Sequence, residues 1–238
     1  RPGYERVRTL NPLVGETNDG YLSDIRARPI TEQHVLDALA GATSGRVDEG
    51  CVGAGTGTSA LGYKAGIGTA SRVVALGDGT ATVGALVQAN FSGTLQVLGV
   101  PLPAEELLAG GDGGLGAPPQ DEPPGNSCMI VVATDAAVDA RQLGRMARRA
   151  VFAMARVGSE FAGGSGDYAI AFSCAEPGTV PVAEGWLDVL FRATVESVEE
   201  ALLNSLFTAT DTVGIDGHRR FAVPHDLAVQ RLRAAGRI

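Results

Sequence analysis

The residues best placed to do chemistry stand where a proline- and glycine-rich stretch meets an apolar run. Residues 118–136 read PPQDEPPGNSCMIVVATDA, so Asn126 and Ser127 directly precede a run with the composition of a buried strand. A strand that holds one side of a peptide bond can keep that bond in a strained, reactive geometry. Attack of the Ser127 hydroxyl on the preceding carbonyl, an N→O acyl shift and hydrolysis would then release Ser127 as a new N-terminus.

A released Ser127 would carry a nucleophile and a base on one residue. An α-amino group has a pKa of about 8, so part of it is neutral near neutral pH and can take the hydroxyl proton. The alternative is that Ser127 is an ordinary first residue of a strand with no chemical role.

Two polar residues of the sequence GGSGD (163–167) favour the chemical interpretation. A strand–helix–strand unit can return Ser165 and Asp167 to the end of the sheet near Ser127. Two hydroxyl groups and a carboxylate there would form a proton relay. The same short sequence is also a common turn between a helix and a strand.

A third candidate ends the segment LVQANF (86–91), which reads as a strand. The side-chain amide of Asn90 could donate a hydrogen bond to an oxyanion. A local turn made by this asparagine is the alternative.

The elements that must position these residues form an α/β pattern. Residues 71–91 predict a hairpin around Gly77-Asp78-Gly79. The run after Ser127 predicts a strand buried on both faces. Helices or strands are also expected at 31–43, 139–158, 167–174, 185–209 and 224–236. The sum predicts one domain over 1–238, a sheet core covered by helices, with residues 103–126 as a flexible tether.

Composition limits the partners of this chain. It has 238 residues and a net charge of −8, which argues against nucleic-acid binding, and the basic run Arg141 to Arg149 reads as a solvated helix face. No apolar run reaches the roughly 18 residues of a membrane span. Three cysteines without CxxC spacing indicate a reducing compartment, the cytoplasm, and three histidines lack metal-ligand spacing. No metal or organic cofactor is expected.

The glycine-dense stretch GAGTGTSALGYKAGIG (53–68) is not a nucleotide-binding motif. It matches neither GxGxxG nor GxxxxGK[ST]. So much glycine instead indicates backbone that passes close to a ligand, another strand or an active site.

Several long blocks, in this order, resemble the β-aminopeptidase / L-aminopeptidase–D-amidase/esterase family of self-processing serine hydrolases. The blocks are GETNDGYLSDI, GAGTGTSALGYKAGIGTASR, TVGALVQANF, NSCMIVVATDA, RQLGRMARRAVFAMARVGS, GGSGDYAIAFS and EEALLNSLFTATDTVGIDG. The resemblance implies a four-layer αββα sandwich and homotetramers of αβ units. It also implies cleavage between Asn126 and Ser127 into an α chain (1–126) and a β chain (127–238).

The resemblance also assigns roles. Ser127 would be the nucleophile, Ser165 a member of the hydroxyl relay and Asp167 its orienting group. Asn90 would donate to the oxyanion. Tyr63 would line the site, and Glu16 would meet the free ammonium group of the substrate. The activity implied is removal of an N-terminal L-, D- or β-amino acid from small peptides, amides or esters through an acyl-enzyme, with no cofactor.

Two alternatives stay open. Members of the family carry a segment ahead of the block around Glu16, and this chain starts only a few residues before Asn11. That departure motivates a truncated, unprocessed chain that is inactive or only binds peptide, and a leader could have been lost with the same segment. An acyltransferase of the ornithine acetyltransferase type would share the self-cleavage, but its nucleophile is expected to be threonine.

Overall fold

The structure is a computed structural model that describes residues 5–9, 11–109, 127–164 and 166–238. Asn126 of the predicted cleavage site and Ser165 of the predicted relay lie outside the described residues. The tether was predicted to begin too early. Residues Ala104–Ala109 form helix α2, because Leu107 and Leu108 are apolar enough to pack into the core.

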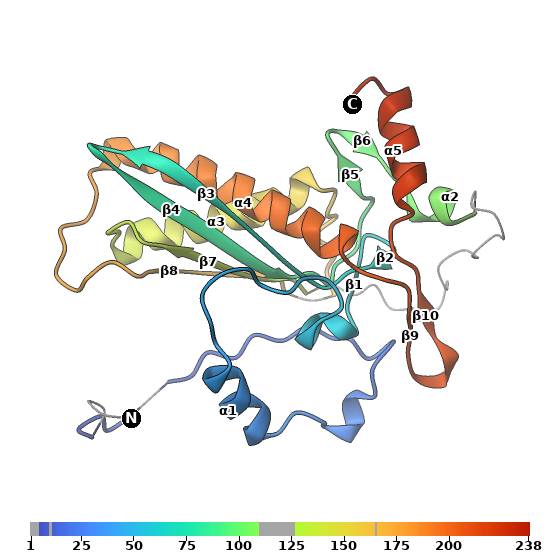
Figure 1. The fold of residues 1–238 in the computed structure, drawn as a ribbon, viewed down its shortest axis with the longest axis horizontal. Helices are drawn as coiled ribbons and strands as arrows, with labels where there is room; N and C mark the ends of the chain where they lie inside the picture. The colour runs from blue at the N-terminus through green and yellow to red at the C-terminus, as the bar shows by residue number, and fades with distance from the viewer. Residues whose placement is uncertain (1–4, 10, 110–126, 165) are drawn as a thin grey trace.

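A four-stranded sheet with strand order β3-β4-β7-β8 organises the molecule (Figure 1). Its strands are β3 (Ile67–Leu76), β4 (Gly79–Gln88), β7 (Met129–Thr134) and β8 (Tyr168–Ser173). The first three are antiparallel neighbours, whereas β7 and β8 are parallel. A parallel pair needs a crossover connection, and helix α3 (Ala140–Arg156) provides it.

The predicted hairpin is confirmed. Leu76 pairs with Gly79, which leaves Gly77 and Asp78 as a two-residue loop. Gly77 has φ +63°, a conformation that glycine adopts without the steric cost of a Cβ atom.

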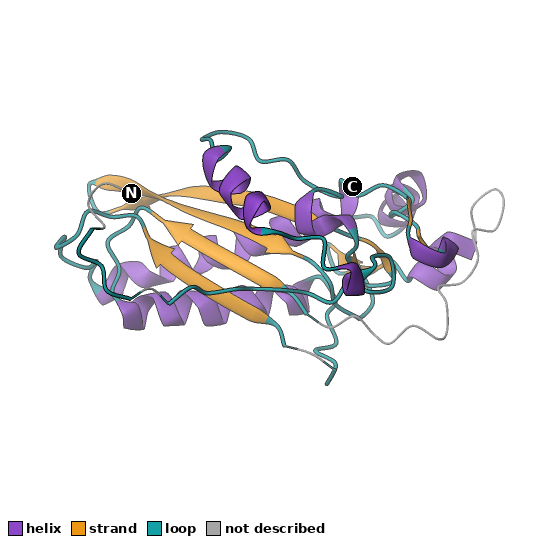
Figure 2. Ribbon diagram, turned by 90° about the horizontal axis from the view of Figure 1, so that it is seen from below, coloured by secondary structure: helices purple, strands orange, loops and turns teal. Residues whose placement is uncertain are grey.

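Helices α3 and α4 (Leu187–Phe207) cover one face of this sheet, as Figures 1 and 2 show from two directions. Side chains of β4 and β7 alternate, and Val83, Val87, Ile130 and Val132 point into the fully buried layer. The helix α4 approaches β3 so closely that a Cβ atom at Gly68 would overlap the carbonyl oxygen of Ala201.

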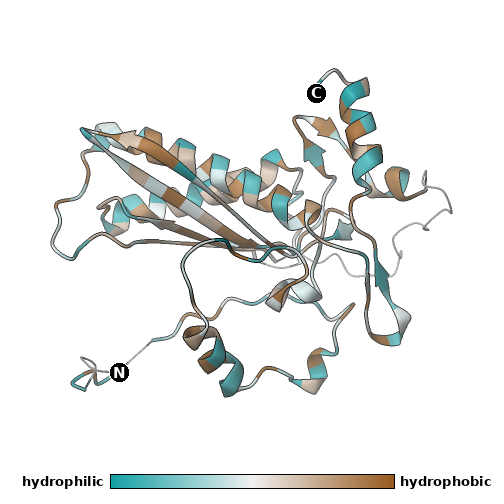
Figure 3. Cartoon of the chain, in the orientation of Figure 1, coloured by the Kyte–Doolittle hydropathy of each residue, from teal (hydrophilic) through white to brown (hydrophobic). Residues whose placement is uncertain are grey.

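The second face of the sheet is more open. Strand β7 alternates between buried and half-buried residues, so the prediction that both its faces are buried was wrong: among the described residues, helices pack on one of these faces. Tyr168 and Phe172 of β8 are 64% and 44% exposed on this face. Figure 3 shows the apolar segments along the strands. Figure 2 shows the N-terminal loop, which crosses these strands. The side chain of Gln88 donates to the hydroxyl of Thr17 in this loop at 2.6 Å.

The α/β class is confirmed. Of the four layers implied by the resemblance, the described residues build this sheet and the α3/α4 layer on it. Helix α1 (Glu32–Ala40) lies away from that layer in Figure 1, begins after Thr31 as predicted, and buries none of its side chains.

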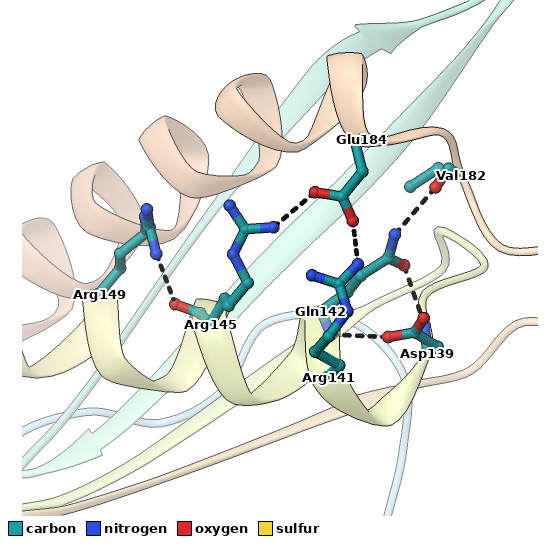
Figure 4. Close-up of polar contacts among 7 residues, drawn as sticks. All are labelled: Asp139, Arg141, Gln142, Arg145, Arg149, Val182 and Glu184. Atoms are coloured by element: carbon teal, nitrogen blue, oxygen red, sulfur yellow. Dashed lines mark hydrogen bonds and ion pairs between the residues drawn. The ribbon is translucent and has the colours of Figure 1, made fainter.

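A capping box starts helix α3. The Asp139 side chain accepts from the backbone N–H of Gln142 at 2.7 Å, and the Gln142 side chain accepts in return from the Asp139 N–H (Figure 4). Gln142 also donates to the carbonyl of Val182 at 2.9 Å, which ties this end of the helix to the next loop.

The basic run of α3 is a solvated face only in part: Arg141 and Arg148 are exposed, whereas Arg145 and Arg149 are half-buried. Arg141 and Arg145 both bind Glu184, the latter at 2.7 Å (Figure 4). The guanidinium of Arg149 lies 3.5 Å from the ring centroid of Phe191 on α4. These contacts hold α3 against the chain that precedes and forms α4.

Short elements complete the described fold and close three two-stranded sheets. They are η1 (Ile25–Ala27), η2 (Gly53–Thr56), β1 (Ser59–Ala60), β2 (Tyr63–Lys64), β5 (Gln96–Val97), β6 (Val100–Pro101), η3 (Glu184–Trp186), β9 (Thr212–Val213), η4 (Ile215–Gly217), β10 (Arg219–Arg220) and α5 (His225–Ala234). Over the described ranges, no helix is both long and apolar enough to span a bilayer.

Candidate active site

Ser127 lies just ahead of β7 and is 8% exposed. Its backbone N–H donates to the carbonyl of Asn90 at 2.6 Å. This bond extends the pairing of β4 with β7 beyond the last strand residues, Gln88 and Met129. The sheet therefore holds the backbone N–H of Ser127 in place, as the junction in the sequence suggested.

Two N–H donors converge on the Ser127 hydroxyl oxygen. The side-chain amide of Asn90 and the backbone N–H of Asn18 each lie 3.4 Å from Ser127 Oγ. Donors fixed around a nucleophilic oxygen are also close to the negative charge that develops during attack on a carbonyl. This arrangement suits acyl transfer.

The amide of Asn90 is fixed from both sides. Its Oδ1 accepts from the backbone N–H of Ser59 at 3.2 Å, and its Nδ2 also donates to the carbonyl of Asn18 at 3.1 Å. The side chain is 2% exposed, and its partners lie far away in the sequence. Asn90 thus serves the region around Ser127, not a local turn.

The parallel pairing of β7 and β8 brings Asp167 to the same edge of the sheet. Met129 pairs with Tyr168, so the residues ahead of the two strands are neighbours. Asp167 Oδ1 accepts from the N–H of Cys128 at 3.0 Å, one residue from the predicted nucleophile. Burial raises the pKa of Asp167, an effect that this hydrogen bond opposes.

The structure shows no hydrogen bond of Tyr63 or Glu16 to Ser127 among the described residues: Tyr63 lies in the core and Glu16 on the surface. Tyr63 is fully buried, and its hydroxyl donates to the carbonyl of Leu102 at 3.0 Å. Burial, and next the charge of Glu105, raise the pKa of the Tyr63 hydroxyl. Glu16 is exposed, two residues before the backbone N–H that reaches Ser127 Oγ.

Sequence reasoning missed Asn18, Ser59 and Lys64. Asn18 and Ser59 contribute backbone N–H groups, which every residue except proline has, so their residue types carried no signal. Lys64 did carry one: it is the single charged residue in the glycine-dense stretch 53–68. Within the described ranges, no group of three or more His, Cys, Asp or Glu side chains could hold a metal ion.

Comparisons with known proteins identify the family of this chain. The chain matches the family model of Peptidase family S58 over residues 2–220. It is 39% identical over 248 residues to the β-peptidyl aminopeptidase BapA of Sphingosinicella xenopeptidilytica, a match that covers 94% of this chain and 60% of that protein.

Two solved structures share the fold. A protein from Pyrococcus horikoshii superposes with a TM-score of 0.84 at 40% identity, covering 99% of this chain and 66% of its own. The L-aminopeptidase D-Ala-esterase/amidase of Ochrobactrum anthropi, described as a prototype of the serine aminopeptidases with a variant Ntn-hydrolase fold, gives 0.81 at 38% identity, covering 92% and 61%.

The sequence resemblance and the self-processing fold type are therefore confirmed. This chain spans about 60% of the length of the curated relatives that it matches. The family match covers most of the chain and includes Ser127, Asn90 and Asp167. The chain belongs to Peptidase family S58.

Proposed function

We propose that this chain is a self-processing aminopeptidase or amidase whose nucleophile is the N-terminal Ser127. The observation that carries the proposal is the environment of Ser127 Oγ. Ser127 lies just ahead of a core strand, and two N–H donors lie 3.4 Å from its Oγ. The Asp167 carboxylate accepts a hydrogen bond from the N–H of the next residue, Cys128.

Processing would break the bond between Asn126 and Ser127. The Ser127 hydroxyl attacks the Asn126 carbonyl, and the amide nitrogen leaves as the α-amine after it takes up a proton. Water then hydrolyses the resulting ester. The products are an α chain (1–126) and a β chain (127–238), and the freed nitrogen stays near the Asn90 carbonyl that its N–H binds at 2.6 Å in the uncut chain.

Turnover would use the same groups. The neutral α-amine of Ser127 takes the hydroxyl proton while the oxygen attacks the substrate carbonyl. Asn90 Nδ2 and the Asn18 N–H stabilise the oxyanion, the leaving amine takes the proton, and water releases the acyl group. Asp167 orients a hydroxyl relay that includes Ser165, and Tyr63 supports the wall of the site.

The substrates proposed are small peptides, amides or esters with a free N-terminal amino group, which Glu16 would bind. Names of relatives support this class: one is a β-peptidyl aminopeptidase, another an L-aminopeptidase D-Ala-esterase/amidase.

We also propose a homotetramer of αβ units, testable by sedimentation of the processed protein. The cysteines are unpaired, which supports a cytoplasmic location.

The first test is the intact mass of the purified chain under denaturing conditions, followed by hydrolysis of aminoacyl p-nitroanilides. Two fragments that meet between Asn126 and Ser127, with hydrolytic activity, are expected. One uncut chain without acylation by a serine-reactive probe would contradict the proposal and favour a chain that only binds peptide.

A further inference from the structure

Lys64 is a fully buried lysine beside the candidate site. Its ammonium group donates to the carbonyls of Gly55 at 2.8 Å, Thr58 at 2.9 Å and Ala65. An ammonium group has three hydrogens, so these three carbonyls match its full donor capacity. A buried charge is stable only with such compensation, and here the compensation comes from the backbone of the glycine-dense stretch.

One of these carbonyls belongs to a peptide group that also reaches Asn90. The C=O of Thr58 and the N–H of Ser59 lie on opposite edges of the same planar unit. Lys64 Nζ binds the first edge at 2.9 Å, and the second edge donates to Asn90 Oδ1 at 3.2 Å. The N–H of Ala65 also donates to the Thr58 carbonyl at 3.2 Å, so this edge has two anchors.

The direction of this peptide group decides which end of the Asn90 amide faces Ser127. With Oδ1 on the Ser59 N–H, Nδ2 points to Ser127 Oγ at 3.4 Å. An amide rotated by half a turn would present Oδ1, an acceptor, to the nucleophile, and no oxyanion donor would remain on that side chain. A cation on the Thr58 carbonyl also polarises the peptide group and strengthens its N–H as a donor.

We propose that Lys64 is a positioning residue that holds the Thr58–Ser59 peptide group so that Asn90 presents its NH₂ group to Ser127 Oγ. The inference rests on the proposed function, in which that NH₂ group binds the oxyanion. It gives a role to a buried lysine whose ammonium group donates to backbone carbonyls beside the nucleophile.

The proposal has a pH consequence. Burial lowers the pKa of Lys64, while Cys51 and Asp19, the ionisable groups that act on it, oppose this effect. When the ammonium group loses a proton, the neutral amine has two hydrogens for the three carbonyls and no charge to polarise them. The Asn90 amide should thus be held in place at pH values below the pKa of Lys64 and released as the pH rises through that pKa. Because burial lowers this pKa, the release should occur at a lower pH than for an ordinary lysine.

The test compares Lys64→Met, Lys64→Arg and wild type in the full chain. Lys64→Met should lower kcat about 10- to 100-fold with KM changed less than about threefold, because a misoriented oxyanion donor affects the transition state. Lys64→Arg keeps the charge and should retain more of kcat. Leu190→Ala, which opens the fully buried layer under α4, is the control: it should lower Tm and leave kcat within about twofold.

A readout independent of activity is the side-chain NH₂ signal of Asn90 in ¹⁵N NMR spectra, assigned by its loss in Asn90→Ser. Lys64→Met should shift this signal and speed its hydrogen exchange, and Leu190→Ala should not. Should Lys64→Met fail to fold, the wild-type protein alone supplies the test, because its Asn90 signal must then change as Lys64 titrates, at a pH below the usual range of lysine.

An Asn90 signal that is unchanged by Lys64→Met, or that stays unchanged while Lys64 titrates in the wild type, would overturn the inference. The same holds for Lys64→Met with the kcat of the Leu190→Ala control. If wild type is uncut and inactive, the proposed function fails, and the Asn90 signal still decides whether Lys64 positions that amide.

Discussion

Two groups of residues, one mostly buried and one exposed, approach Ser127 Oγ from different segments of the chain. The first, called the core wall, consists of Ser59, Lys64 and Asn90. The second, called the N-terminal wall, consists of Glu16 and Asn18. Each delivers one N–H to the oxygen at 3.4 Å. Lys64 and Asn90 are at most 2% exposed, whereas Glu16 and Asn18 are exposed.

The walls also differ in how they are held. Asn90 is fixed by the Ser59 peptide group, which Lys64 and Ala65 anchor in turn. The N-terminal wall is exposed and is tied to the body by bonds such as Gln88 to Thr17 at 2.6 Å and Asn90 to the Asn18 carbonyl at 3.1 Å. A rigid donor serves transition-state stabilisation, and an exposed segment can adapt to substrates. Substitutions in the core wall should therefore change kcat, and those in the N-terminal wall KM.

The largest effect is expected where the two walls meet. Ser127→Ala removes the oxygen that both serve, so no self-cleavage should occur and hydrolysis should fall by at least about 10³-fold. Mass spectrometry and a p-nitroanilide assay measure this. Ser71→Ala, at an exposed serine of β3, is the matched control and should be cleaved normally. Cleavage in Ser127→Ala would contradict the assignment of Ser127 as the nucleophile that both walls contact.

Removal of the core donor should come next. Asn90→Ala takes away the NH₂ group and should lower kcat by about 10²–10³-fold, the usual cost of a lost oxyanion donor. The measurement is steady-state kinetics on processed protein, with circular dichroism to verify folding. A main effect on KM would contradict the assignment of rigid, transition-state contacts to the core wall.

Asp167→Asn separates charge from structure beside the nucleophile. The amide oxygen can still accept from the Cys128 N–H, but the carboxylate is lost, and self-cleavage should slow about 10- to 100-fold. The rate is measured as the loss of uncut chain over time by mass spectrometry.

Asp167→Asn should slow self-cleavage without lowering the stability of the fold at neutral pH. Burial raises the pKa of Asp167, so the folded value lies above the unfolded one and ionisation costs stability at neutral pH. That cost is relieved as pH falls through the folded pKa. Melting temperatures should thus show Asp167→Asn at or above wild type at pH 7, and the gap should close towards pH 4. A lower Tm at both pH values would show that the carboxylate is a structural requirement.

The smallest effect is expected in the N-terminal wall. Glu16→Gln removes the charge that would meet a substrate ammonium group, and KM should rise up to about tenfold with kcat nearly constant. Glu32→Gln, on the exposed first turn of α1, provides the control. The comparison predicts an effect confined to substrates with a free amino group, so equal changes for N-acetylated substrates would contradict it.

Much of the fold was predictable because its signals are local. The two-residue turn at Gly77 and Asp78, the cap at Thr31 and the amphipathic pattern of α3 each depend on neighbours in the chain. The wrong details depend on packing between distant segments. Whether the second face of β7 is covered, or whether Arg145 meets solvent or Glu184, is decided by elements far away in the sequence.

The site divides in the same way. The strand–helix–strand pattern predicted that Asp167 lies near Ser127, because parallel strands start at one edge of a sheet. For Asn90 the residues alone left a local turn open, and the resemblance to the family supplied its expected role. Ser165 lies outside the described residues, and the part of Tyr63 stays a prediction, since the structure shows its hydroxyl on Leu102.

Residue type and spacing identified the serine at a junction and the strands that hold it, because local sequence encodes these features directly, and several long blocks in order carried the resemblance to the family. The folded arrangement was needed to show that the Asn18 backbone N–H reaches Ser127 and that Lys64 lies behind the peptide group that orients Asn90. The physical reason is that backbone donors are common to nearly all residues and acquire direction only when folding brings distant segments into contact.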